Sequence, residues 1–116
     1  DTATKAPHEN YYHGFLNGLF SNCKDIITDY HSNYESGDGY ADITFKSRRN
    51  SIAVVIEIKA VTREEDLDEY AQRALEQIEE KNYCAPFLKI SRVKNILAFG
   101  IAFGGKDCAV AFRNVK

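Results

Sequence analysis

The sequence contains no methionine and no apolar run long enough to cross a membrane as a helix, and no signal peptide is visible at its start. We therefore expect a cytoplasmic protein with no membrane partner. Because translation starts with methionine, the absence of this residue predicts that these 116 residues are a fragment of a longer chain. The polar residues 1–6 are expected to be a poorly ordered lead-in.

The sequence is also poor in cysteine and in net charge. Cys23, Cys84 and Cys108 are odd in number and far apart, which excludes a disulfide framework and a zinc site. We expect them to be small buried residues in a reducing compartment. The formal net charge of −2 provides no general attraction for nucleic acid, although basic residues cluster locally in 46–49 and 89–94.

The most apolar stretch runs from Ser51 to Lys59 and predicts a buried β-strand, because β-branched residues dominate it. It nevertheless ends with two charged residues, Glu57 and Lys59. Side chains alternate along a strand, so both charges must lie on one face, while Ile56 and Ile58 pack on the other. Because unpaired buried charge is costly, the pair indicates either a functional site or an ion-paired strand end.

A second acidic residue, Asp42, lies in an alternating stretch that predicts a half-buried strand, and a polar hairpin turn follows it. If Lys46 pairs with Ser51, then Asp42 lies opposite Val55, on the same face as Glu57 and diagonal to it. Two carboxylates that converge in this way can bind one divalent cation. A slip of one residue would move Asp42 to the wrong face, so the metal site depends on this register.

The order of these residues resembles a known family. Asp42, followed after a hairpin by Glu57-Ile58-Lys59, resembles the PD-(D/E)XK nuclease superfamily. Residues 34–42, with a Gly-x-Gly-x-x-Asp pattern, and residues 74–83, with a helical glutamine, are similar to a bacterial subgroup of nuclease-like domains. The resemblance covers about residues 9–112. It implies that the chain is the C-terminal part of a larger bacterial protein with an AAA-type ATPase-like N-terminal region.

The resemblance implies a magnesium or manganese site. Asp42 and Glu57 would supply carboxylate ligands, and the backbone carbonyl of Ile58 would add a third oxygen. In this family an acid on the first helix often helps to hold the metal, which makes Glu9 a candidate ligand. A carboxylate stabilised by the helix dipole explains Glu9 equally well. His13 lies one helical turn from Glu9 and could reach the site, although a surface or hydrogen-bonded histidine is the favoured interpretation.

The resemblance also implies roles around the metal. Lys59 would orient the attacking water or stabilise the transition state, and Gln77 would point back at the catalytic strand. Glu35 would lie at the mouth of the site. The alternative interpretation of Gln77 is a polar residue at the boundary of an apolar helix face. The alternative interpretation of Glu35 is a solvated carboxylate. Tyr40 stands where the subgroup usually has an arginine, which is a departure from its pattern.

The predicted elements follow the order α-β-β-β-α-β-β within one domain, 1–116. Strands three and four should be parallel, because a helix connects them. We expect an α/β fold, a restriction-endonuclease-like three-layer sandwich with a mixed central β-sheet flanked by helices. The expected helices are 8–20 and 62–81, with a capping box at 62–65 and a short helical turn within 82–94, and the expected strands are 25–34, 40–46, 51–59, 96–103 and 108–112.

The resemblance and the residues together predict a magnesium-dependent phosphodiesterase that cleaves nucleic acid, with DNA as the first candidate. Many nucleases of this superfamily act as dimers, so a homodimer is a further expectation. The first alternative is a non-catalytic domain that binds nucleic acid or another part of the parent protein. The second is a purely structural ion pair at the end of a strand. Two converging acids favour the nuclease, because a domain that only binds does not need them.

Overall fold

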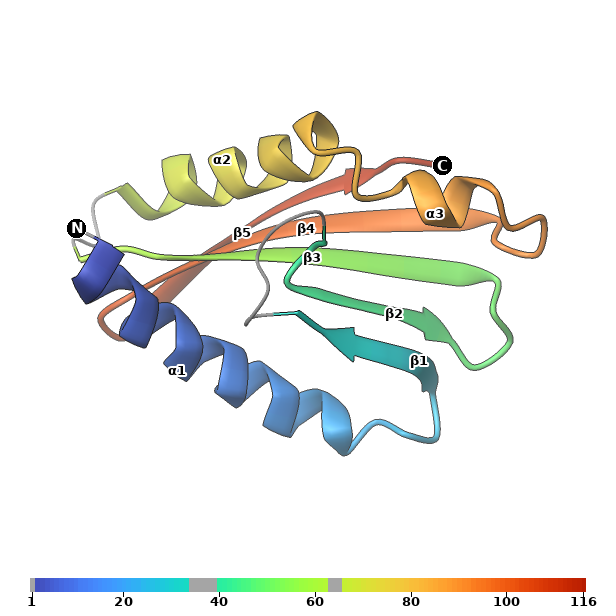
Figure 1. Ribbon diagram of the computed structural model, residues 1–116, viewed down its shortest axis with the longest axis horizontal. Coiled ribbons are helices and arrows are strands. Elements are labelled where there is room, and N and C mark those ends of the chain that lie inside the picture. Colours follow the sequence, from blue (N-terminus) through green and yellow to red (C-terminus); the bar gives the residue numbers. More distant parts are fainter. Residues whose placement is uncertain (1, 34–39, 63–65) are drawn as a thin grey trace.

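The computed structural model describes the backbone of residues 2–33, 40–62 and 66–116, and the side chains within these ranges from residue 11 onward. The elements follow the predicted order, with one short helix in the connector before the fourth strand (Figure 1). In chain order they are α1 (Thr2–Ser21), β1 (Ile27–Ser32), β2 (Ile43–Ser47), β3 (Ile52–Ala60), α2 (Leu67–Glu80), α3 (Ala85–Leu88), β4 (Asn95–Gly104) and β5 (Asp107–Asn114).

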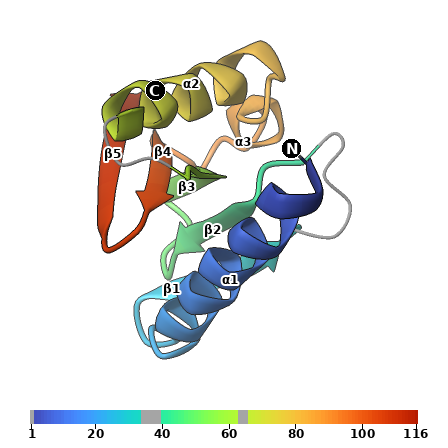
Figure 2. The same cartoon turned by 90° about the vertical axis from the view of Figure 1, so that its left-hand side faces the viewer.

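The strands form one mixed sheet in the order β1-β2-β3-β4-β5. β3 and β4 are parallel, as the crossover through α2 predicts, and the other three pairs are antiparallel. Helix α1 covers one face of the sheet, while α2 and α3 cover the other (Figure 2). The predicted α/β sandwich with a restriction-endonuclease-like order of elements is therefore confirmed.

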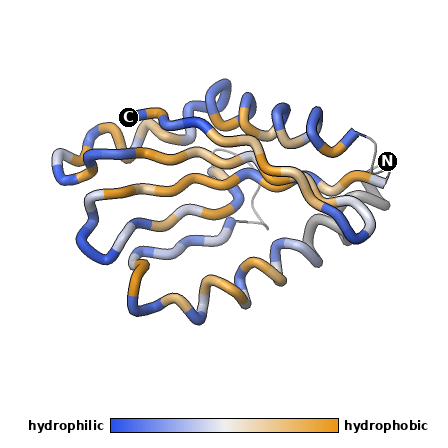
Figure 3. Tube along the Cα trace, turned by 180° about the vertical axis from the view of Figure 1, so that it is seen from behind, coloured by the Kyte–Doolittle hydropathy of each residue, from blue (hydrophilic) through white to orange (hydrophobic). Residues whose placement is uncertain are grey.

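The central strand β3 is buried because helices cover both faces of the sheet (Figure 2). The strands in the middle of the sheet are mostly hydrophobic (Figure 3). Val54, Ile56 and Ile58 pack in a cluster with Leu16 of α1. Val55 packs on the opposite face, in a cluster with residues of α2. Helix α2 buries apolar residues spaced three and four apart, as the sequence predicts: Leu67, Ala71, Ala74, Leu75 and Ile78.

Helix α2 approaches the sheet most closely at Gly100 in β4. A Cβ atom at this position would lie 2.2 Å from the carbonyl oxygen of Ala71 and 2.5 Å from the backbone nitrogen of Leu75. Such distances are shorter than any van der Waals contact, so only glycine permits this approach. Gly100 pairs with Glu57 of β3, so this close packing also brings α2 near the strand that carries the predicted site residues.

The register predicted for the β2–β3 hairpin is wrong. Lys46 pairs with Ala53 instead of Ser51. The turn extends through Ser51, beyond the predicted end at Asn50, which has a φ of 61°. The turn keeps the length of the predicted one but lies one position later in the chain, so each residue of β2 pairs with a residue of β3 two positions later than predicted. Because side chains alternate, a shift of two residues preserves the face and moves Asp42 from a diagonal position to one opposite Glu57.

Several other bounds differ from those expected. Helix α1 begins at Thr2, within the predicted lead-in. Helix α2 begins only at Leu67, and its N-cap Asp66 makes no side-chain cap bond. The predicted capping box falls largely on residues 63–65, which lie outside the described residues. Cys84 is buried as expected, but Cys108 is exposed because it lies on the edge strand β5. Within the described ranges, no helix has both the length and the apolar character needed to span a bilayer.

Candidate active site

The candidate site lies where the pairing of β2 with β3 ends. The last pair joins Ile43 to Ile56, and β3 then continues beside β4 as far as Ala60. Asp42 immediately precedes β2, and its carboxylate takes the place of a strand partner. Its Oδ2 accepts a hydrogen bond of 2.7 Å from the backbone N–H of Ile58. The end of the hairpin thus holds one carboxylate against the edge of the central strand.

Asp42 and Glu57 contact each other directly. The backbone N–H of Asp42, one residue beyond the last ladder pair, donates to the side-chain Oε1 of Glu57 at 3.2 Å. Glu57 is only 5% exposed, and it is one of two buried polar or charged residues among the described side chains. Asp42 and Glu57 thus lie beside each other at the end of the hairpin.

A chain of hydrogen bonds through α2 joins Glu57 to Lys59. Gln77 donates through Nε2 to Oε2 of Glu57, and Lys59 donates through Nζ to Oε1 of Gln77, each at 2.7 Å. Both charged residues lie on the face of β3 that α2 covers, in agreement with the alternation of the strand. Gln77 is half-buried at the edge of the apolar face of α2. One amide therefore holds a carboxyl group and an ammonium group in fixed positions.

The two carboxyl groups have unusual acidities. The pKa of Glu57 is raised to about 8, mainly by burial and secondly by the charge of Asp42. Burial also raises the pKa of Asp42 above its usual value. Two adjacent carboxyls with little access to solvent resist ionising together, because each charge disfavours the other. The pair therefore favours either a retained proton or a bound cation, and a cation would displace the proton.

His13 of α1 contacts the backbone of Asp42 from the face of the sheet opposite to α2. Its Nε2 lies 3.0 Å from the backbone oxygen of Asp42, and the side chain is 3% exposed. Burial lowers the pKa of His13, which favours the neutral ring. Since a carbonyl oxygen only accepts, Nε2 carries the proton and donates a hydrogen bond to the backbone oxygen of Asp42. The sequence signal for this contact was the helical spacing that could bring His13 to the site.

Comparison with protein-family models matches residues 7–113 to the PD-(D/E)XK nuclease superfamily. The chain belongs to this superfamily. Comparisons with curated proteins and with solved structures gave no match. In this PD-(D/E)XK domain, Asp42 and the Glu57-Ile58-Lys59 triplet are the residues that resemble the motif, and the structure brings their side chains or backbone together.

Two of the predicted site residues cannot be placed. The side chain of Glu9 and the whole of Glu35 lie outside the described residues. Tyr40 is described and is 62% exposed, two residues before Asp42. Among the side chains that the structure describes, no three His, Cys, Asp or Glu form a group suited to a metal ion. The described acidic side chains at this corner of the PD-(D/E)XK domain are Asp42 and Glu57.

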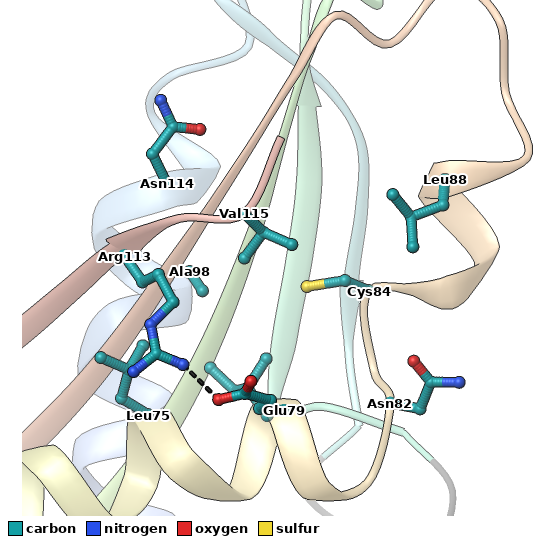
Figure 4. Close-up of a pocket in the computed structure, with 10 residues that line it drawn as sticks. Leu75, Glu79, Asn82, Cys84, Leu88, Ala98, Arg113, Asn114 and Val115 are labelled. Carbon is teal, nitrogen blue, oxygen red and sulfur yellow. Dashed lines mark hydrogen bonds and ion pairs between the residues drawn. The ribbon is translucent and has the colours of Figure 1, made fainter.

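Two cavities lie along helix α2. One of about 400 Å³ adjoins the site and is lined by Lys59 and Gln77 together with Lys81. Another, of about 250 Å³, lies between α2, α3 and the end of β5, with the ion pair of Glu79 and Arg113 beside it (Figure 4). None of the predicted site residues is among the described residues that line this second cavity.

Proposed function

We propose that this domain is a metal-dependent nuclease that hydrolyses phosphodiester bonds of nucleic acid, with DNA as the first candidate substrate. The observation that carries the proposal is the contact between Asp42 and Glu57, two carboxyls that share one buried corner with the ammonium group of Lys59. Burial of two adjacent acids is costly, and a domain that only binds a partner gains nothing from it.

The donor set suits magnesium or manganese. Asp42 and Glu57 would hold the ion with hard oxygen atoms, which these metals prefer. The backbone carbonyl of Ile58 fits as a third donor, because its N–H already faces Asp42, and the N–H and C=O of one strand residue point to the same neighbour. When bound, such an ion neutralises charge on the phosphate oxygens and lowers the pKa of a water molecule. We also propose Glu9 as a further ligand, since it precedes His13 by one helical turn.

The remaining residues would position the reactants. Lys59 would orient the attacking water or stabilise the charge of the transition state, since Gln77 holds its ammonium group in place. Gln77 would also fix the orientation of Glu57. Glu35 and Tyr40 are proposed to lie at the mouth of the site, because they flank the glycine-rich stretch before Asp42.

A cleavage assay tests this proposal. Supercoiled plasmid, linear duplex, single-stranded DNA and RNA are incubated with magnesium or manganese and wild-type protein, Asp42→Ala, or Asp42→Asn, which retains a hydrogen-bond acceptor. Asp107→Asn, an exposed acid of β5, is the matched control. We expect cleavage by the wild type and the control alone. Equal cleavage by the Asp42 variants would show contamination or a wrong ligand, and no cleavage by any protein would contradict the proposal.

The second candidate function is a non-catalytic domain that kept the fold. The net charge of −2 and the tyrosine in place of arginine at position 40 favour it. Such a domain would bind nucleic acid or the ATPase-like N-terminal region of a bacterial parent chain, as a monomer or homodimer in the cytoplasm. Metal binding separates the two functions, because only a formed site lets magnesium raise the melting temperature.

A further inference from the structure

We propose that a third cavity, beside Asp42, binds an unstacked nucleobase next to the scissile phosphodiester, so that the substrate is a single strand or a locally unpaired segment. This inference rests on the proposed nuclease function and specifies its substrate class. The cavity has a volume of about 520 Å³, which is in the range of small-ligand sites. It lies between the start of β2 and the connection from α2 to α3, segments that are distant in sequence.

Aromatic side chains dominate the apolar lining. Tyr40 is 62% exposed, Phe87 is half-buried and Tyr83 is buried, so the three aromatic residues that line the cavity differ in their access to solvent. Pro86 adds a further apolar surface. Every nucleobase has a π-face, and aromatic side chains commonly hold single-stranded bases by stacking. A paired base remains inside the duplex stack, so only a base that has left the stack can enter.

The polar lining fits a nucleotide better than an apolar ligand. Asn82 and Thr44 present amide and hydroxyl groups of the kind that hydrogen-bond to base edges. Lys81 lies at the same cavity and offers a positive charge for a phosphate. Among the described residues that line it, none is acidic, although the whole chain has a formal net charge of −2. No described lining residue would therefore repel a phosphate group, although the protein as a whole is acidic.

The position of the cavity relates it to the candidate site. Ala41 lines it directly before Asp42, and the backbone N–H of Asn33, another lining residue, donates to the carbonyl oxygen of Asp42 at 2.8 Å. Lys81 lines both this cavity and the one that contains Lys59. A strand with its phosphate at the two acids can thus place a base in the aromatic cavity and a neighbouring phosphate near Lys81.

The test measures binding separately from cleavage. A labelled short single-stranded DNA, the matching RNA and the matching DNA duplex are titrated in fluorescence anisotropy, with calcium in place of magnesium. The variants are Tyr40→Ala and Phe87→Leu, which removes a ring but keeps an apolar side chain. Tyr11→Ala is the control, because Tyr11 is an equally accessible tyrosine on α1, at 70% exposed. Lys81→Ala is compared with Lys89→Ala, since both lysines are helix C-caps.

We expect the single strand, as DNA or RNA, to bind more tightly than the duplex. Loss of one stacking ring should weaken single-strand binding about 5- to 150-fold, and the tyrosine control should not. Lys81→Ala should weaken binding and reduce its salt dependence, while Lys89→Ala should leave both unchanged. An oligonucleotide with one abasic position near the cleaved bond should bind the wild type more weakly than the intact strand does. Phe87→Leu, by contrast, should bind the abasic and the intact strand with equal affinity.

Equal affinity for single strand and duplex, or unchanged single-strand affinity in both ring variants, would overturn the inference even if magnesium-dependent cleavage is observed. Absence of any oligonucleotide binding would also overturn it and would leave a protein contact as the use of the cavity. Ring-dependent binding without cleavage would support the inference while the proposed catalytic function fails. The two claims are therefore separated by their outcomes.

Discussion

The backbone N–H of Asp42 donates to the carboxyl group of Glu57, and desolvation raises the pKa of both acids, the buried Glu57 and the half-buried Asp42. Asp42 therefore affects the ionisation of Glu57 in two opposite ways. The hydrogen bond stabilises the charge on Glu57, whereas the nearby carboxylate opposes it. A divalent cation between the two acids would remove this opposition, which gives several consequences for experiment.

Removal of either acid should abolish the response of stability to metal. At ten times its dissociation constant, magnesium should stabilise the wild type by about 1.4 kcal/mol, which is a rise of roughly 5 °C in melting temperature for a domain of this size. Asp42→Asn and Glu57→Gln should lose this rise, measured by differential scanning fluorimetry. Glu69→Gln, an exposed acid on α2, should retain it. A full rise in either site variant would show that the metal binds elsewhere.

The stability of the metal-free protein should fall as pH rises from 6.5 to 8. The pKa of Glu57 is raised from 4.5 to about 8, so in this range the folded state binds a proton that the unfolded state has released. His13, whose pKa is lowered from 6.5, changes stability in the opposite direction but only below that pH. Urea unfolding in EDTA should show the fall in the free energy of unfolding.

Glu57→Gln provides the control for this pH dependence. It lacks the titrating carboxyl group, so its free energy of unfolding should change much less over the same range. Magnesium affinity of the wild type should rise with pH, because the metal must displace the proton held by the pair. A flat pH profile for the metal-free wild type would contradict the raised pKa.

Gln77→Ala should lower the cleavage rate without removing the metal. Gln77 bonds both Lys59 and Glu57, so its loss frees the ammonium group and one carboxylate oxygen. We expect kcat to fall about 100- to 1,000-fold, in the range seen when one positioned donor is removed. Gln72→Ala, an exposed glutamine on the same helix, is the control. A similar loss in both variants would point to destabilisation of α2 instead of misplacement of Lys59.

The close packing of α2 on β4 can be tested with two glycines. Gly100→Ala should destabilise the domain by about 1–3 kcal/mol or more, because its Cβ would overlap the backbone of α2. Gly14→Ala should instead stabilise α1 by about 0.5–1 kcal/mol, since no atom lies within 4 Å of the new Cβ and alanine favours helices. Urea unfolding distinguishes the two, and an unaffected Gly100→Ala would refute the close approach.

Local sequence determined much of the fold. Alternation along residues 51–59 assigned Glu57 and Lys59 to one face, because strand side chains alternate whatever the neighbours are. The spacing of apolar residues predicted α2, and the helix between β3 and β4 predicted their parallel pairing. These features depend on periodicity and connectivity, which are properties of a short segment or of the order of segments.

Tertiary structure decided how the site is assembled. The hairpin register depended on where the turn lay, and a shift of the turn by one position along the chain placed Asp42 opposite Glu57 instead of diagonal to it. Contact of Gln77 with both charged residues required α2 to pack at Gly100, and contact of His13 with Asp42 required α1 to pack on the opposite face. Such contacts join segments far apart in the chain, so their geometry follows from packing and not from any local pattern.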